Sequence, residues 1–439
     1  MRPFAPQGPA AGGDRRGGAL RARGERAPEV GCRVPAPALS SPLPHSDAAT
    51  RSAVVLLALA AFFSGAAMRI CDGLLPRLAS DFAITPGVAG RVVLTFAVAY
   101  GLSQLLFGPL GDRYGKARVM CGALFACGLA SLACVLAPGF DALVRLRVFW
   151  GIAAAGVIPL AIAWIGDAVH YAQRQATLAR LLTGTLSGMT AGQLGGGLFA
   201  DSPLGWRGAF SALCAGYFVV GTLLLVRLRS IPAAPPVRGG GRFAFAAQLG
   251  AVLAVPWARA VVAAVFAEGV FLMGPLAFLP SYLHQRFGLA LSAASALIAL
   301  YALGGLVYAL VARHVVQRLG EQRMVAAGGV LMGLGFLGLY AIPAAWLAAP
   351  IALALGFGTY LFHNTLQVNA TQMAPATRGT ALALFAFCFF NGQAIGVTLA
   401  GYAFDHGGPL PLLVVPAVAL PLVGWAFAGG LRRRAGATA

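Results

Sequence analysis

The chain has 439 residues, enough for two or three soluble domains, but its composition excludes that arrangement. Charged residues make up 10% of the chain, against about 25% in an ordinary soluble domain, whereas hydrophobic residues make up 59%. Twelve membrane-spanning helices of about 20 residues need about 240 apolar positions, which this composition supplies. We therefore expect most of the chain to lie in a lipid bilayer. A soluble enzyme, a disordered scaffold and a disulfide framework are excluded.

The net charge is +19, from 32 basic and 13 acidic residues. The basic residues lie between apolar runs, so the excess predicts membrane topology and not a nucleic-acid partner. The seven cysteines have no C-x-x-C spacing and predict neither a metal site nor a structural disulfide. A phosphate-binding G-x-x-x-x-G-K loop is absent from the sequence, so we expect no ATP and no other cofactor.

Residues 1–52 are rich in Pro, Gly, Ala and Arg without a hydrophobic period, which predicts a disordered tail. Six apolar runs follow, at about 53–78, 89–110, 117–137, 140–165, 176–199 and 207–228. Six more lie at about 258–283, 290–312, 324–342, 346–368, 379–403 and 410–431. The expected parts are thus an N-terminal six-helix bundle (53–229), a flexible cytoplasmic linker (230–256), a C-terminal six-helix bundle (257–431) and a cytoplasmic tail (432–439).

The distribution of arginines predicts the orientation in the membrane. The N-terminal tail, the even-numbered connections and the C-terminus hold most of them, while the opposite side holds little beyond Arg77, Arg207 and Arg286. Positively charged loops stay in the cytoplasm. We therefore expect a multi-pass protein of the inner (plasma) membrane with both termini cytoplasmic.

The two sets of six runs form an internal repeat. A shift of 204 residues places Gly188, Gly192, Gly197 and Asp201 on Gly392, Gly396, Gly401 and Asp405. Because each unit has an even number of helices, both halves enter the membrane from the same side, as parallel repeats do. The predicted fold is an all-α polytopic membrane protein of twelve transmembrane helices in two six-helix bundles. Its site is expected between the halves, near the bilayer midplane.

The connection after the second run reads Gly108-Pro-Leu-Gly-Asp112-Arg113-Tyr-Gly115-Lys116-Ala-Arg118. A helix must end, turn and restart here, which Gly108 and Gly115 permit. This segment resembles the signature loop G-x-L-a-D-R-x-G-r-k of the major facilitator superfamily. The resemblance extends over about residues 53–431 and implies a secondary transporter. It also implies a cytoplasmic gate loop made of Gly108, Asp112, Arg113, Gly115 and Arg118, in which Asp112 belongs to a charge relay that closes the inward face.

The fourth run carries Arg147-x-x-Trp150-Gly151, which resembles a second motif of that family, where the arginine is tied to proton or substrate coupling. Arg147 lies roughly 10 Å inside the outer boundary, and Asp72 lies at a similar depth. A bare charge there costs a few kcal/mol or more, so we expect an Asp72–Arg147 pair. Arg69, one turn from Asp72, competes for it. A purely structural ion pair is the alternative to a proton-coupling role.

The fifth run contains the sequence Gly188-x-x-x-Gly192-Gln193-Leu-Gly-Gly196-Gly197. Glycines four residues apart let two helices approach closely. The stretch resembles the family's antiporter motif, except that Gln193 replaces its defining proline. A helix-packing seam and an antiporter signature are therefore both open readings.

Glu268 lies about ten residues into the seventh run, near the midplane, and is the third proton-coupling candidate beside Asp72 and Arg147. An intramembrane carboxylate is a functional hypothesis by default. Gly274-Pro275, two turns later, should break or kink this helix. Further candidates for lining the cavity are Arg69, Tyr100, Gln104, Tyr301, His363, Asn364, Asn391 and Gln393.

Within the superfamily, Asp72-Gly-Leu-Leu-Pro76 with Asp81-Phe82 resembles the twelve-helix drug and sugar exporters. That resemblance implies a monomer that exports a small amphipathic molecule in exchange for protons by alternating access. Three alternatives stay open: an importer or facilitator of a sugar or organic acid, a non-transporting membrane sensor, and a membrane-embedded enzyme.

Overall fold

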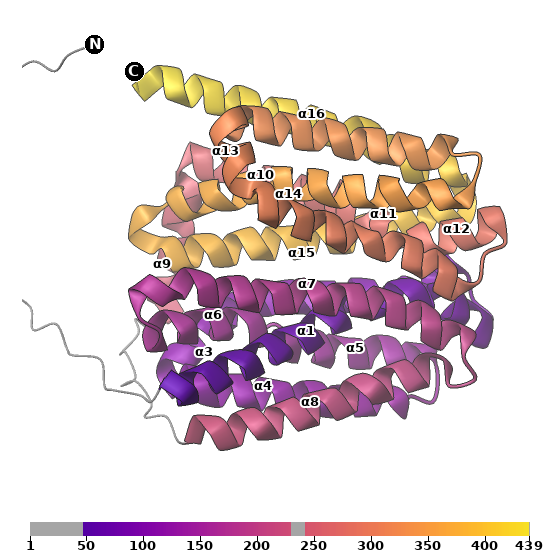
Figure 1. Ribbon diagram of the computed structural model, residues 1–439, viewed down its shortest axis with the longest axis horizontal. Helices are drawn as coiled ribbons and strands as arrows, with labels where there is room; N and C mark the ends of the chain where they lie inside the picture. The colour runs from indigo at the N-terminus through magenta and orange to yellow at the C-terminus, as the bar shows by residue number, and fades with distance from the viewer. Residues whose placement is uncertain (1–46, 230–241, 439) are drawn as a thin grey trace, which may run out of the picture. The chain divides into compact units, whose positions relative to one another are not determined.

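The computed structural model describes residues 47–229 and 242–438. Residues 1–46 of the expected disordered tail and the first part of the expected linker, 230–241, lie outside the described residues. Residues 47–52 of that tail begin a helix, so the prediction of disorder is wrong for them. Figure 1 shows long helices running side by side, with the N-terminal half (indigo to pink) below the C-terminal half (rose to yellow). The described chain begins, at Asp47, and finishes, at Thr438, at the same end of the bundle, which we call the terminal end. The opposite end is called the far end.

Six spans make up the N-terminal half, and two of them are interrupted near glycines. The second span is broken at Gly90, and the fourth is broken at Ala155 and Gly156. The helices are α1 (Asp47–Asp81), α2 (Pro86–Ala89) with α3 (Arg91–Tyr114), α4 (Lys116–Val135), α5 (Phe140–Ala154) with α6 (Val157–Ala168), α7 (Tyr171–Asp201) and α8 (Gly205–Arg229).

The C-terminal half repeats this pattern with more irregular turns. Its first helices are α9 (Arg242–Ala254), α10 (Pro256–Glu268), a π turn η1 (Gly269–Met273), α11 (Gly274–Leu276) and α12 (Leu279–Phe287). These are followed by α13 (Leu291–Ala341), η2 (Ala345–Leu347), α14 (Ala348–Gln372), η3 (Pro375–Thr377), α15 (Arg378–Tyr402), a π turn η4 (Ala403–Gly407) and α16 (Pro409–Thr438). Inside α13, Gly320 has φ 67° and ψ 168°, so this helix consists of two arms that meet at a turn.

The number of spans agrees with the prediction of twelve. Ten helical stretches in the described part of the chain are long and apolar enough to cross a membrane. That number takes the two arms of α13 as one stretch and leaves out α7, which has 31 residues. When both arms and α7 are included, each of the twelve predicted apolar runs corresponds to one span.

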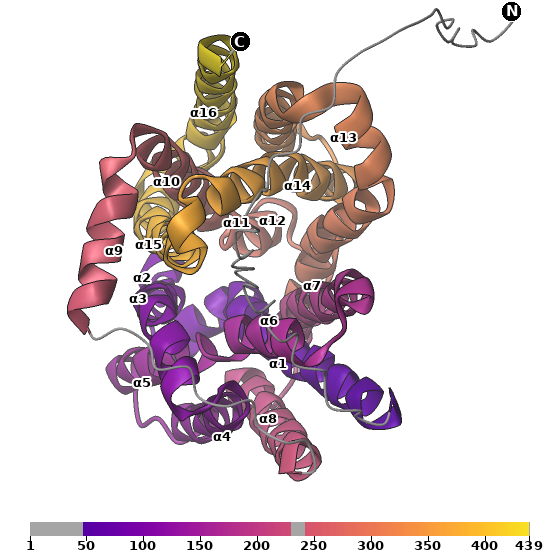
Figure 2. The same cartoon turned by 90° about the vertical axis from the view of Figure 1, so that its left-hand side faces the viewer.

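The expected linker is not flexible throughout, because residues 242–254 form helix α9. This segment is rich in alanine and buries Val252, and the Oγ1 atom of Thr380 donates a 2.8 Å hydrogen bond to Oε1 of Gln248. In Figure 2, α9 runs across the view while most spans are seen nearly end-on. At the other end of this half, α16 continues to Thr438, so most of the expected C-terminal tail is helical.

Close packing of glycines on backbone holds each half together. Gly188 and Gly192 of α7 lie against the carbonyl oxygens of Phe62 and Ala66 of α1, so that no side chain would fit at either glycine. The equivalent glycines of α15, Gly392 and Gly396, lie against the carbonyl oxygens of Phe266 and Val270. Contact between the halves is made by α7 with α13 and by α3 with α15. The cavity candidates on these helices therefore lie near the boundary of the two halves.

Candidate proton and substrate site

A polar pair of side chains lies in the interior where α10 ends. Glu268 is fully buried, and its Oε2 atom shares a 2.9 Å hydrogen bond with Nδ1 of His363 on α14. The Oε1 atom of Glu268 has no hydrogen-bond partner among the described residues. The His363 side chain is 23% exposed and its ring contacts Phe385 and Phe389 of α15. The fully buried carboxylate of Glu268 is thus hydrogen-bonded to the partly exposed imidazole of His363.

The local sequence explains why Glu268 stands at a break in the helix. Pro275 has no backbone N–H to donate, and the chain before it widens into the π turn Gly269–Met273. The predicted break at Gly274-Pro275 is therefore present, and Glu268 is the last α-helical residue before it. Gly269 allows α10 to approach the carbonyl oxygen of Phe389, which brings Glu268 close to α14 and α15.

The predicted pair between Asp72 and Arg147 is wrong. Arg69 takes that place, with its Nη1 atom 2.9 Å from Oδ2 of Asp72, one turn along α1. Arg147 instead donates from Nε to the carbonyl of Val92 at 3.1 Å, and its guanidinium lies over the ring of Phe96 at 4.2 Å. Equal depth in the membrane does not determine helix rotation, and a partner on the same helix needs no particular rotation.

Arg69 also contributes to a narrow crevice between the halves. The crevice has a volume of about 10 Å³, and Gln193 of α7 and Tyr301 of α13 line it together with Arg69. A space of this size holds roughly one water molecule. Within the part of the chain that the structure describes, neither polar atom of the Gln193 side chain has a hydrogen-bond partner. Tyr301 is itself buried, so its ring closes the crevice beside Arg69.

Other predicted cavity residues fall into two groups. Tyr100 packs against Phe390 across the boundary between α3 and α15, with 4.4 Å between the ring centroids, and Gln104 lies one turn further along α3. Asn391, beside Phe390, donates a 2.8 Å hydrogen bond to the carbonyl of Phe387 on its own helix.

The second group lies within the C-terminal half. Asn364 donates a 2.8 Å hydrogen bond to the hydroxyl of Tyr308, and Gln393 is buried on α15. The candidates are therefore not one cluster, and the shared feature of the first group is its position between the halves.

The predicted gate loop lies at the terminal end. Gly115 has φ 90°, and Oδ1 of Asp112 is 4.0 Å from Nζ of Lys116. The closer partner of Lys116 is Asp167 at the end of α6, at 2.5 Å. Asp167 was not among the predicted site residues, although an acid at the terminal end of a span was a visible signal. Three other loop residues have no such partner among the described residues: Gly108 faces open space, Arg118 is exposed, and Arg113 lies over the ring of Tyr114.

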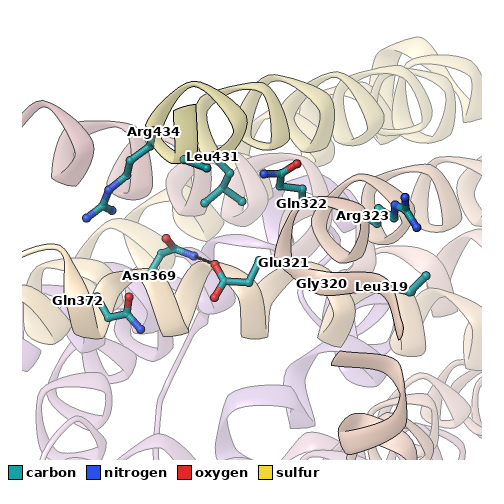
Figure 3. A pocket seen from close by; sticks show the side chains of 10 residues that line it. Leu319, Gly320, Glu321, Gln322, Arg323, Asn369, Gln372, Leu431 and Arg434 are labelled. Carbon is teal, nitrogen blue, oxygen red and sulfur yellow. Dashed lines mark hydrogen bonds between the residues drawn. The ribbon is translucent and has the colours of Figure 1, made fainter. Parts of the chain in front are cut away.

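The C-terminal half has a corresponding contact between two side chains, and both of them line an open pocket of about 550 Å³. Figure 3 shows Glu321 and Asn369 pointing toward one another, and Nδ2 of Asn369 donates a 3.0 Å hydrogen bond to Oε2 of Glu321. The remaining lining residues are Leu319, Gly320, Gln322, Arg323, Gln372, Leu431, Arg434 and Ala435. Because this pocket lies at the terminal end of one half, it is separate from the crevice between the halves. In the described ranges, no three His, Cys, Asp or Glu side chains gather into a possible metal site.

Comparison with known proteins is consistent across sequence and structure. The sequence matches the family described as Major Facilitator Superfamily over residues 57–397 and again over 287–435. A chloramphenicol resistance protein of Streptomyces lividans is 29% identical over 374 residues, which cover 81% of this chain and 91% of the relative. A gallate transporter of Pseudomonas putida is 26% identical over 397 residues, covering 82% and 87%.

Solved structures of similar fold are also transporters. A bacterial homologue of the human lysosomal transporter Spinster, inward-facing and unoccupied, has a TM-score of 0.66 at 17% identity, covering 88% of this chain and 94% of that one. A D-xylose–proton symporter has a TM-score of 0.67 at 15% identity, covering 86% and 96%. At this level of identity the likeness shows the fold, which is the twelve-helix arrangement.

Proposed function

The chain belongs to the major facilitator superfamily, and from this premise we propose that it is a secondary transporter that exports a small amphipathic molecule in exchange for protons. It would act as a monomer in the inner (plasma) membrane, with the terminal end in the cytoplasm. The excess of arginine at that end supports the orientation. Similarity to a chloramphenicol resistance protein supports export of an organic compound.

The observation that carries proton coupling is the bond between Glu268 and His363. Burying a lone carboxylate costs several kcal/mol, so the ionised form of Glu268 depends on a positively charged or hydrogen-bonding partner. His363 is such a partner, and its partial exposure gives protons a path to Glu268. Substrate that disturbs this pair would change the proton occupancy of Glu268, which is what coupling requires.

The second charged cluster is Arg69 with Asp72, and Arg69 lines the crevice between the halves. Because both side chains are buried and paired, their net charge is zero, and Asp72 is a second candidate for taking up a proton. Arg147 interacts electrostatically with Asp72 without bonding to it. Rocking of the two halves about the α3–α15 and α7–α13 contacts would expose this layer to each side in turn.

A second candidate function is uptake of a small organic acid. The similarity to a gallate transporter favours it, as does Gln193, which stands where the antiporter motif has proline. An importer would use the same layer of polar residues. The direction of net substrate movement under an imposed proton gradient separates the two functions.

The test uses purified full-length protein in proteoliposomes that contain a pH-sensitive dye. Drugs, sugars and organic acids are added one at a time, and proton flux is recorded with parent, Glu268→Gln and the matched control Glu321→Gln. We expect flux with one compound class, lost in Glu268→Gln and kept in Glu321→Gln, whose carboxylate is exposed. Equilibration of labelled compound without proton flux would contradict coupling, and equal flux in all three proteins would contradict the role of Glu268.

A further inference from the structure

The carboxylate of Asp201 joins the two halves at the far end. Asp201 is the last residue of α7, in the N-terminal half, and lies against the first turn of α13, in the C-terminal half. Its Oδ1 atom accepts a 3.2 Å hydrogen bond from the backbone N–H of Leu291. Its Oδ2 atom accepts from the N–H of Ser292 at 2.8 Å and from the Ser292 hydroxyl at 2.6 Å.

Asp405 makes the reverse connection. It lies in the π turn after α15, in the C-terminal half, and its Oδ1 atom accepts a 2.9 Å hydrogen bond from the N–H of Gly87 in α2 of the N-terminal half. Its Oδ2 atom accepts from the hydroxyl of Thr85, the residue that precedes α2. Each half therefore presents one aspartate to a helix start of the other half.

The two contacts are copies of one another. Asp201 and Asp405 are 204 residues apart, and so are their partners Gly87 and Leu291. The same spacing aligns the glycines of the internal repeat. Two equivalent contacts at two separate interfaces are therefore a property of the duplicated unit and not a single chance encounter.

The physical chemistry of helix starts makes these contacts favourable. The first N–H groups of a helix have no partner within the helix and carry a partial positive charge, so an ionised carboxylate satisfies both needs. Below them, Ser295 of α13 is fully buried between Gly73 and Gly197 of the N-terminal half. Five hydrogen bonds join described residues of the two halves, and all five are those of Asp201 and Asp405.

We propose that Asp201 and Asp405 are a symmetric pair of positioning residues that hold the far end closed, and that both contacts must break before the central site opens there. This inference rests on the proposed transport function only for its role in a cycle. The closure itself is a conformational property that can be measured without substrate.

The test uses Ser295→Cys in the full chain as a reporter, since this side chain is buried while the far end is closed. The rate of maleimide labelling is measured on purified protein in detergent, with the parent chain as the blank for native cysteines. Asp201→Ala, Asp405→Ala and the double variant are compared with Asp141→Ala. The Asp141 side chain is 72% exposed and pairs with Arg91 in its own half, at 3.6 Å, so it is a matched loss of one carboxylate.

We expect each single variant to label faster by roughly tenfold, the double variant faster still, and Asp141→Ala at the rate of the reporter alone. Asp201→Asn, whose amide oxygen still accepts from a backbone N–H, should label at nearly the rate of the reporter alone. This variant distinguishes hydrogen bonding to the helix start from the effect of the negative charge. An unchanged rate in the double variant, or an equal rise in Asp141→Ala, would overturn the proposal. If the alanine variants at the aspartates fail to fold, Ser292→Ala and Thr85→Ala are used, since each removes one hydroxyl hydrogen bond. We expect each to raise the labelling rate by a smaller factor, and an unchanged rate in both would contradict the proposal.

The outcome is independent of the proposed function. Faster labelling of the aspartate variants, in a protein that transports none of the compounds, would support the proposed closure and contradict the proposed transport function. Proton-coupled transport, with an unchanged labelling rate in the aspartate variants, would support the transport function and contradict the closure.

Discussion

The Nδ1 atom of His363 lies 2.9 Å from the Oε2 atom of Glu268, although 95 residues separate them in the chain. The π turn after Glu268 and the glycine contacts of α15 bring the two together. This bond gives a buried carboxylate a neighbour that can hold a proton and whose side chain is 23% exposed. Its consequences can be tested one side chain at a time.

Replacing His363 by glutamine should interrupt the proton relay. Glutamine can still bond to Glu268 but cannot carry a proton at neutral pH, so we expect proton flux in proteoliposomes to fall by about tenfold or more. His314→Gln is the control, because His314 is exposed on α13. A fall of the same size in both variants would show that the loss is not specific to the Glu268 site.

Removing Arg69 alone should be costly. Asp72 is fully buried, and Arg69→Met leaves its carboxylate without an ion-pair partner, so we expect a loss of about 3–5 kcal/mol in the free energy of unfolding. The double variant Arg69→Met with Asp72→Leu should recover most of that loss, because both charges are then gone. Thermal unfolding in detergent measures the cycle, and additive losses would contradict the pairing.

A methyl group at Gly188 should destabilise the N-terminal half. Its Cβ would meet the carbonyl oxygen of Phe62, so we expect Gly188→Ala to cost about 1–3 kcal/mol. Gly122 of α4 faces open space, and Gly122→Ala should be neutral or stabilising by up to about 1 kcal/mol. Equal melting temperatures for the two variants would refute the close approach of α1 and α7.

Gln193 should favour function at the expense of stability. Both polar atoms of its side chain are buried and have no hydrogen-bond partner in the described ranges, so Gln193→Leu should stabilise the protein by about 1–3 kcal/mol. If the crevice contacts substrate or a bridging water, the same change lowers the transport rate. A stabilised variant with unaltered transport would assign Gln193 to helix packing alone.

The closure of the far end should resist acid. Partial burial acts to raise the pKa of Asp201, but the hydrogen bonds from Ser292 and Leu291 outweigh it and hold this pKa below its ordinary value of 3.8. A carboxyl whose pKa is lowered in the closed state stabilises that state above the ordinary value and loses the effect as pH falls below it. Because maleimide reacts with the thiolate, the labelling rate of Ser295→Cys is divided by that of a small free thiol at the same pH. This ratio should be unchanged from about pH 8 to about pH 5. A rise within that range would assign the opening to another titrating group.

Hydropathy predicted the twelve spans because the cost of placing polar residues in a bilayer acts on whole segments. The internal repeat was predicted separately, from glycines and an aspartate that recur at a spacing of 204 residues. Side-chain partners depend instead on helix rotation, which hydropathy leaves open, and this is why Asp72 pairs with Arg69 and not with Arg147. Glu268 was recognised from its depth, but its bond to His363 requires the π turn, which is a tertiary feature. The repeat made Asp201 and Asp405 visible as equivalent residues, yet nothing in the spacing indicated that each contacts the other half.

The far-end contacts lie at two different edges of the boundary between the halves. Asp201 acts where α7 meets α13, and Asp405 acts where α2 and α3 meet α15. Loss of one contact therefore loosens one edge while the other still resists separation. A variant with a single change therefore still has to break the remaining contact before the central site opens, and the position of that contact decides which edge separates last.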